Sequence, residues 1–266
     1  MTIEAFAPAK INLTLHVTGQ RDDGYHLLDS LVVFANVGDH LDIEPAPEMA
    51  LEVTGPFADG VPSDASNLVW RAAQMAGVTA RIALTKELPN GAGIGGGSSD
   101  AAAVLRTLGG EAHALALGAD VPVCLLDCPQ RMRGIGDDVA PVGGVPPLDL
   151  VLVNPGVHVP TQDVFKRLAS KDNAPMDAHL NWSDRAAFLT WLGDQRNDLQ
   201  ASAAAQTSEI SSALDALKGA QLVRMSGSGA TCYGVYPGPW LAREAADRIA
   251  GAHPDWWVRA VGTVGA

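Results

Sequence analysis

One stretch of the chain, residues 88–108, reads Leu-Pro-Asn-Gly-Ala-Gly-Ile-Gly-Gly-Gly-Ser-Ser-Asp-Ala-Ala-Ala-Val-Leu-Arg-Thr-Leu. Five glycines fall within seven residues of it, and an apolar helical pattern follows, ending before Gly109. Because glycine has no Cβ, such a loop can adopt positive φ angles and approach an anion closely. The free amides and the positive dipole end of a helix starting near Ser98 would then hold a phosphate. The stretch therefore predicts a phosphate-binding loop.

Three other interpretations of the loop fit less well. A Walker A loop requires a lysine where this chain has Gly97. The dinucleotide fingerprint G-x-G-x-x-G matches residues 91–96, but the acidic candidates that should complete it, Glu111 and Asp120, follow no apolar strand. A flexible glycine linker would not run directly into a helix with an apolar face.

Three segments carry a family resemblance. They are Pro89-x-x-x-Gly93-Ile94-Gly95-Gly96-Gly97-Ser98-Ser99 in the loop, Ala-Pro-Ala-Lys-Ile-Asn-Leu at residues 7–13, and Met-Ser-Gly-Ser-Gly-Ala-Thr at residues 225–231. They resemble the second, first and third motifs of the GHMP kinases, in the order of that family. Further segments at residues 19–26, 118–122 and 154–161 are similar to the family members that act on a cytidylyl small molecule.

The resemblance implies an ATP-dependent kinase in the cytoplasm, with Mg²⁺ as cofactor and a small-molecule cytidylyl substrate. Two alternatives stay open. One is another GHMP kinase, of the homoserine or mevalonate type, and the segments at residues 19–26 and 118–122 speak against it. The other is a catalytically silent nucleotide sensor on the same fold, which should lack Lys10 or Asp120, whereas both are present.

The resemblance also implies an α+β fold of two domains, an N-terminal ribosomal-protein-S5-like domain and a C-terminal ferredoxin-like domain. Periodicity in the second half agrees, because it predicts the order β-α-β-β-α-β, with strands at residues 149–154, 221–225, 231–236 and 257–261. Residues 141–147 are rich in proline and glycine and show no periodicity. We expect the junction there, with domains at residues 1–147 and 148–266.

The first half shows the pattern of strands around the motifs. Residues 10–17 alternate polar and apolar, which predicts one half-buried strand with Lys10 and Asn12 on its polar face. Further strands are expected at residues 28–34, 41–43, 51–53 and 81–88. A helix is expected from Asn67 to Met75, capped by Ser66 and ended by Gly77.

Composition limits the function classes. The 266 residues carry a net charge of −12, which argues against nucleic acid as a partner. We expect no membrane span and no signal peptide. The cysteines, Cys124, Cys128 and Cys232, form no metal-ligand pattern and are expected to be buried and reduced. The oligomeric state and the protein ligands of Mg²⁺ are not defined by the sequence.

Lys10 and Asp120 are the predicted catalytic residues. Asp120 stands in a turn of small residues before an apolar run, a place with no packing reason for a carboxylate. We interpret it as the general base, with helix capping as the alternative. Lys10 should lie beside it and attract the transferring phosphoryl group, with a sheet-edge ion pair as the alternative. Lys86, the other lysine of the first 165 residues, could belong to the site or be solvated.

The remaining site predictions concern binding. The nucleotide residues are Pro89, Asn90, Gly91, Ala92, Gly93, Ile94, Gly95, Gly96, Gly97, Ser98, Ser99 and Asn67. The substrate residues are Asn12, Tyr25, His26, Thr161 and Phe165. For Ser98, Ser99 and Asn67 the alternative is helix capping, and for Tyr25 and His26 it is a turn-flanking pair with a half-buried ring.

Four smaller points complete the sequence predictions. The third motif, residues 226–229, could be an ordinary hairpin turn. Asp137 and Asp138 are interpreted as turn residues. The connection at residues 109–117 is shorter than is usual in the family, which questions the placement of Asp120. No functional role is assigned to residues 49–63.

Overall fold

A computed structural model describes residues 1–265. By its contacts the chain divides into two compact units that interleave along the sequence. The first unit consists of residues 1–10, 37–90 and 95–127, and the second consists of residues 11–36 and 91–94 together with the chain from residue 128 onward. The glycine-rich loop changes unit between Ile94 and Gly95. The expected domain boundary at residue 147 stays a prediction.

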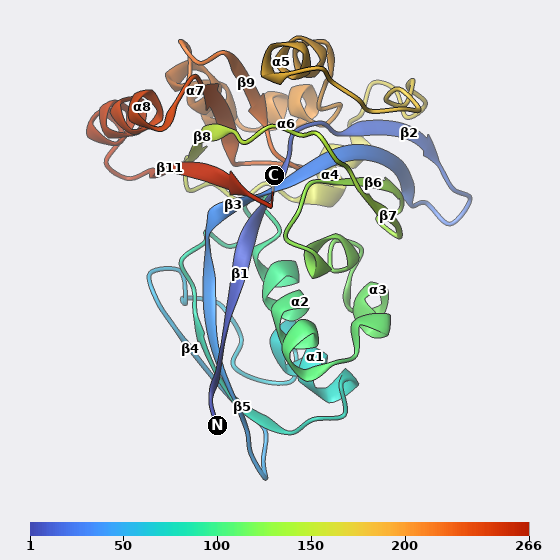
Figure 1. Ribbon diagram of the computed structural model, residues 1–266, viewed down its shortest axis with the longest axis vertical. Helices are drawn as coiled ribbons and strands as arrows, with labels where there is room; N and C mark the ends of the chain where they lie inside the picture. The colour runs from blue at the N-terminus through green and yellow to red at the C-terminus, as the bar shows by residue number, and fades with distance from the viewer. Residues whose placement is uncertain (266) are drawn as a thin grey trace. The chain divides into compact units, whose positions relative to one another are not determined.

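Strands and helices follow one another as in Figure 1. The strands are β1 (Ile3–Asn12), β2 (His16–Gln20), β3 (His26–Pro45), β4 (Ala50–Thr54), β5 (Ala80–Thr85), β6 (Gln130–Gly134), β7 (Asp138–Pro141), β8 (Asp149–Asn154), β9 (Leu222–Met225), β10 (Cys232–Tyr236) and β11 (Trp257–Val264). The α-helices are α1 (Leu68–Met75), α2 (Gly96–Leu108), α3 (Ala114–Leu117), α4 (Thr161–Lys166), α5 (Arg185–Asp194), α6 (Gln200–Gln206), α7 (Ser208–Ala216) and α8 (Pro239–Ala252). Two short 3₁₀ helices are η1 (Glu111–His113) and η2 (Pro122–Leu125).

The first unit is a sheet covered by helices. Strand β5 lies between β4, which runs parallel to it, and the second half of β3, which is antiparallel. In β5 the residues Ala80, Ile82 and Leu84 are buried and alternate with more exposed ones, so one face is apolar. Helix α2 buries every residue from Ser99 to Leu105 and packs against α1 and η2, as expected of a core helix.

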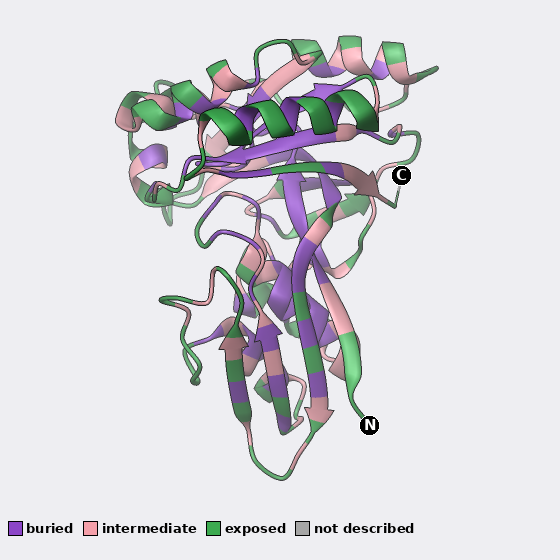
Figure 2. Cartoon of the chain, turned by 90° about the vertical axis from the view of Figure 1, so that its left-hand side faces the viewer, coloured by how far each residue is buried: buried purple, intermediate pink, exposed green. Residues whose placement is uncertain are grey.

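The second unit contains a four-stranded antiparallel sheet in the order β11-β8-β10-β9. The predicted β-α-β-β-α-β order is confirmed, because α4 to α7 lie between β8 and β9, and α8 joins β10 to β11. Helix α8 buries one stripe, Ala242, Ala245, Ala246 and Ile249, at helical spacing. Figure 2 shows its remaining surface exposed.

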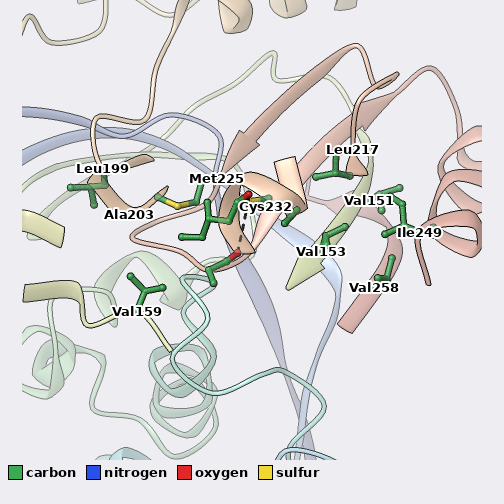
Figure 3. Packing of buried hydrophobic residues seen from close by; sticks show 14 of the residues in the cluster. Val151, Val153, Val159, Leu199, Ala203, Leu217, Met225, Cys232, Ile249 and Val258 are labelled. Atoms are coloured by element: carbon green, nitrogen blue, oxygen red, sulfur yellow. Dashed lines mark hydrogen bonds between the residues drawn. The ribbon is translucent and has the colours of Figure 1, made fainter. Parts of the chain in front are cut away.

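The core of this unit joins distant segments of the chain. Leu15 and Val17, from the N-terminal segment, are buried in one cluster with Val151, Val153 and Val258. Figure 3 shows the valines of β8 and β11 packed with Ile249 of α8 and Leu217, which follows α7. The N-terminal segment is therefore part of the C-terminal core.

The expected strand at residues 10–17 is wrong in two respects. Strand β1 ends at Asn12. The amide of Leu15 then donates to the carbonyl of Arg196 (2.9 Å) rather than to a residue of β3. The polar side chains are also buried rather than solvated, since Thr14 and His16 are 0% and 1% exposed. They find partners inside: the Thr14 hydroxyl accepts from the amide of Leu31 (2.7 Å), and His16 contacts the carbonyl of Ala174 (3.2 Å).

Other element predictions need smaller corrections. The strands expected at residues 28–34 and 41–43 form one long strand, β3, and the hairpin of β6 and β7 was not predicted. Asn67, not Ser66, caps α1. Asp137 lies in a turn as predicted, but Asp138 begins β7 and pairs with Arg133.

Candidate active site

Lys10 and Asp120 form an ion pair in the first unit. Their Nζ and Oδ2 atoms are 2.8 Å apart, with the lysine side chain 4% exposed and the aspartate side chain 42% exposed. The predicted proximity is confirmed, and the N-cap position of η2 is held by Val121 rather than by Asp120. A buried cation thus faces a carboxylate that solvent and ligands can reach.

Arg106 of α2 fixes the segment that carries Asp120. Its guanidinium donates to the carbonyl of Phe6 on β1 (3.0 Å) and to the carbonyl of Cys124 in η2 (2.5 Å). These bonds join the helix after the loop to both segments that supply the ion pair. The short connection at residues 109–117 therefore does not move Asp120 away from Lys10.

Cys124 is fully buried next to this pair. Burial raises the pKa of its thiol to about 12, with smaller contributions from Lys10 and Asp120. The thiol is neutral at physiological pH, and a neutral thiol is not the nucleophilic form of cysteine. Cys124 is therefore a packing residue, as is buried Cys232, whereas Cys128 is partly exposed, contrary to the expectation.

The glycine loop delivers free amides next to Lys10. Gly95 caps α2 in the left-handed region (φ +67°), and a Cβ built there would lie 3.1 Å from Cβ of Lys10. The first helical bond runs from the amide of Ser99 to Gly95 (2.8 Å), so the amides of residues 96–98 precede the helical ladder. Amides at a helix N-terminus that precede the ladder, beside a buried ammonium group, are chemically suited to an anion.

The two serines differ in role, and neither caps the helix, which begins two residues earlier than predicted. Ser99 is buried, and its hydroxyl donates to the carbonyl of Pro8 (2.8 Å). Ser98 is partly exposed in the first turn. Within the loop, Ala92 and Ile94 are buried apolar residues, whereas Gly91 and Gly97 are exposed.

In the second unit the three motifs meet. The Ser226 hydroxyl accepts from the amide of Asn12 (3.0 Å) and donates to the carbonyl of Gly93 (3.0 Å). A Cβ on Gly93, whose φ is +74°, would lie 2.6 Å from the carbonyl oxygen of Ser226. The third motif is indeed the turn between β9 and β10, yet its backbone packs directly on the loop, a contact that its sequence did not reveal.

Aromatic side chains gather elsewhere in this unit. His26 stacks on Phe165 of α4, with ring centroids 4.6 Å apart and planes at 27°. Burial, with a smaller effect of Lys171, lowers the pKa of His26, so the ring is neutral at pH 7. Tyr25 precedes it and is 59% exposed rather than half buried. The Thr161 hydroxyl lies 2.8 Å from that of Ser228 in the third motif.

The side-chain amides of three predicted site residues, all asparagines, differ in the hydrogen bonds that they make within the chain. Asn12 donates to Ser30 (2.8 Å), while its buried Oδ1 has no partner within the described chain. Asn67 is occupied at both ends of its amide, by the amide of Val69 (2.8 Å) and the carbonyl of Pro62 (2.7 Å). Asn90 donates to the carbonyl of Phe57 (2.8 Å), which ties the unassigned segment 49–63 to the start of the loop.

Lys86 is buried rather than solvated. It is 3% exposed and contacts two buried carboxylates, Asp39 and Asp100. No sequence pattern indicated this cluster, because Asp39 and Asp100 lie 47 and 14 residues from Lys86 in the chain.

Family comparisons agree with this arrangement. The descriptions "GHMP kinases N terminal domain" and "GHMP kinases C terminal" match residues 67–120 and 178–255. The chain belongs to the GHMP kinases, with their two-domain α+β fold, and members of this family transfer phosphate from ATP to small molecules.

Individual proteins similar to this chain belong to one particular kind of GHMP kinase. The chain is 52% identical to the 4-diphosphocytidyl-2-C-methyl-D-erythritol kinase of Ruegeria pomeroyi, over 97% of this chain and 98% of that protein. It is 54% identical to the enzyme of the same name from Paracoccus denitrificans, over 96% and 95%. A crystal structure of 4-(cytidine 5'-diphospho)-2C-methyl-D-erythritol kinase superposes with a TM-score of 0.78 at 34% identity, covering 99% of this chain and all of that one. A homoserine kinase from Cytophaga hutchinsonii (TM-score 0.66, 17% identity) shares the fold.

Proposed function

We propose that this protein is a kinase that transfers the γ-phosphoryl group of ATP to the 2-hydroxyl of 4-diphosphocytidyl-2-C-methyl-D-erythritol, a step of non-mevalonate isoprenoid precursor synthesis. Relatives at about 50% identity over nearly their full length support this substrate. The observation that carries the chemistry is the Lys10–Asp120 pair beside the free amides of the loop. Because ATP is the donor, we place the reaction in the cytoplasm.

Each charged group has one task in this reaction. The Asp120 carboxylate accepts the proton of the attacking 2-hydroxyl as its oxygen bonds to phosphorus and the bond from phosphorus to the leaving ADP oxygen breaks. The Lys10 ammonium balances charge on the alcohol oxygen and the transferring group. The amides of residues 96–98 hold the phosphates, and no covalent enzyme intermediate is needed.

The donor set fits Mg²⁺ bound mainly by the nucleotide. Residues 1–265 contain no cluster of three or more His, Cys, Asp or Glu able to hold a metal. Mg²⁺ commonly binds phosphates with one or two protein oxygens and water. The Ser98 hydroxyl would supply one such oxygen, and the ion would neutralise phosphate charge.

We assign the aromatic group of the second unit to the cytosine. Exposed Tyr25 and the stacked pair of His26 and Phe165 offer ring faces to a base, and neutral His26 offers ring nitrogens to its edge. The unpartnered Oδ1 of Asn12 would accept a hydrogen bond from a substrate hydroxyl. Thr161 is assigned to the substrate as well. The nucleotide role of Asn67 stays a prediction, since α1 uses its side chain.

Acceptor-dependent ADP release tests the proposal. Purified protein with ATP and Mg²⁺ should release ADP with the cytidylyl substrate, and far more slowly with homoserine or mevalonate. Phosphorus NMR of the product should show a new phosphomonoester. Binding of ATP without ADP release for any acceptor would indicate the silent sensor instead.

No helix within residues 1–265 combines the length and apolarity that a membrane crossing needs.

A further inference from the structure

A buried charged cluster lies beneath the glycine loop in the first unit. It consists of Asp39 of β3, Lys86 directly after β5, and Asp100 of α2. Lys86 donates to both carboxylates, to Asp100 over 2.7 Å. The three residues are at most 3% exposed, so the cluster joins two strands and the loop's helix away from water.

The cluster holds the chain on both sides of the loop. Before the loop, Oδ1 of Asp39 accepts the amides of Glu87 (2.6 Å) and Leu88 (2.9 Å). After the loop, Asp100 anchors α2 one turn from its start. A Cβ built on Gly96, the first residue of α2, would lie 3.5 Å from Nζ of Lys86 and 3.6 Å from Oδ2 of Asp39.

The charge of the cluster is uneven. Two carboxylates face one ammonium group, and Oδ1 of Asp100 has no partner among residues 1–265. Excess negative charge beneath amides that hold phosphates would oppose nucleotide binding. The Lys86 ammonium group, in contact with both carboxylates, offsets much of that charge. Lys86 stays charged, because Asp100 and Asp39 outweigh the effect of burial and its net pKa is raised.

We propose that Asp39, Lys86 and Asp100 are positioning residues for the nucleotide, which fix the first turn of α2 and thereby set how tightly its amides hold the phosphates. The inference rests on the proposed function, because it assumes that the loop binds ATP. The residues touch neither substrate. They should govern nucleotide affinity while leaving the proton transfer at Asp120 unchanged.

Binding of the ATP analogue AMP-PNP with Mg²⁺, measured by calorimetry, tests this. Asp100→Ala should raise its dissociation constant at least fivefold, with the KM of the cytidylyl substrate and kcat at saturating ATP within twofold of wild type. Asp100→Asn keeps an oxygen for Lys86 and should restore the affinity to within twofold. Lys86→Arg keeps the positive charge but changes the length and shape of the side chain, and should raise the dissociation constant of AMP-PNP at least threefold. This variant tests the inference even if Asp100→Ala does not fold.

A matched control separates positioning from stability. Asp29 is also a buried aspartate paired with a basic residue, Arg131 (2.6 Å), but it lies in the second unit. Asp29→Ala should lower the melting temperature and leave AMP-PNP affinity within twofold. Equal affinity in wild type, Asp100→Ala and Lys86→Arg would overturn the inference alone. Wild-type protein that binds no AMP-PNP would overturn the proposed function as well.

Discussion

The Lys10–Asp120 pair combines a buried cation with an accessible base, and this asymmetry suits an enzyme that must admit an alcohol to the carboxylate. Asp120→Asn keeps the shape and a bond to Lys10 but removes the proton acceptor. We expect kcat to decrease about 10³-fold, in the range typical of general-base catalysis, with AMP-PNP affinity within threefold of wild type. Steady-state ADP release and calorimetry measure the two. Near-full turnover would remove Asp120 from the mechanism.

Tyr25 is expected to act on binding rather than on chemistry. Tyr25→Ala should raise the KM of the cytidylyl substrate about tenfold, since a stacked base contributes about 1–3 kcal/mol, and leave kcat within twofold. Trp240→Ala is the control, because Trp240 is also an exposed aromatic residue of the second unit, 71% accessible, on α8. An equal change of KM in both variants would argue against a cytosine site at Tyr25.

The Asp100 carboxyl should make stability depend on pH. Its pKa is raised from 3.8 to about 8 in the folded state, so the folded chain binds more protons than the unfolded chain between these values. The contribution of this group is therefore greatest at the acid end and is lost as pH rises toward about 8. In thermal scans from pH 5 to about pH 9, wild type should lose stability relative to Asp100→Asn. A melting-temperature difference that stays constant over this range would contradict the assignment.

Single residues show what the sequence could and could not predict about the site. Lys10 and Asp120 were predictable because each stands in a short motif whose residue types are unusual for packing. The roles of Lys86 and Ser226 were not, since their partners lie far away in the chain and a buried pair leaves no periodic signal. For Ser99, the sequence predicted its position at the end of the loop. Its hydrogen bond to the carbonyl of Pro8 could not be predicted, because it depends on the fold.

The sequence predicted helix α2 and the residue where it ends. It did not predict where α2 starts, because Gly95 caps the helix without a side chain. The break between β1 and β2 was not predictable either, because no characteristic residue marks it. Alternation at residues 10–17 continues through Thr14, and only the tertiary bonds to Leu31 and Arg196 divert the chain there. In the C-terminal half, long periodic segments with capping residues made the order of elements predictable.

Gly95 should be essential for activity beyond its effect on stability. Gly95→Ala places a Cβ 3.1 Å from Lys10 at a φ of +67°, so it should both destabilise the fold by about 1–2 kcal/mol and displace the ammonium group. We expect kcat to decrease at least tenfold. Gly77→Ala, after the end of α1 in the same unit, is the control, with φ +71° and no atom within 4 Å of the new Cβ. It should lose similar stability in chemical unfolding and keep its kcat, whereas equal kcat losses would reject the contact with Lys10.

Because the two units of the chain interleave, the boundary predicted at residue 147 can be tested directly. Leu15 and Val17 belong to the core of the second unit, most of which lies after residue 147. A fragment of residues 1–147 should therefore lack a cooperative thermal transition by circular dichroism, while the full chain shows one. A cooperative transition in the fragment would support the boundary predicted from sequence.

The burial of Leu15 and Val17 also has a consequence for synthesis on the ribosome. Their partner Val258 is made about 240 residues later, which takes ~10–50 s at ~5–20 residues per second. During that time the emerging N-terminal segment has no completed core in which to bury these side chains. Until then, Leu15 and Val17 lack part of the core that buries them in the folded protein.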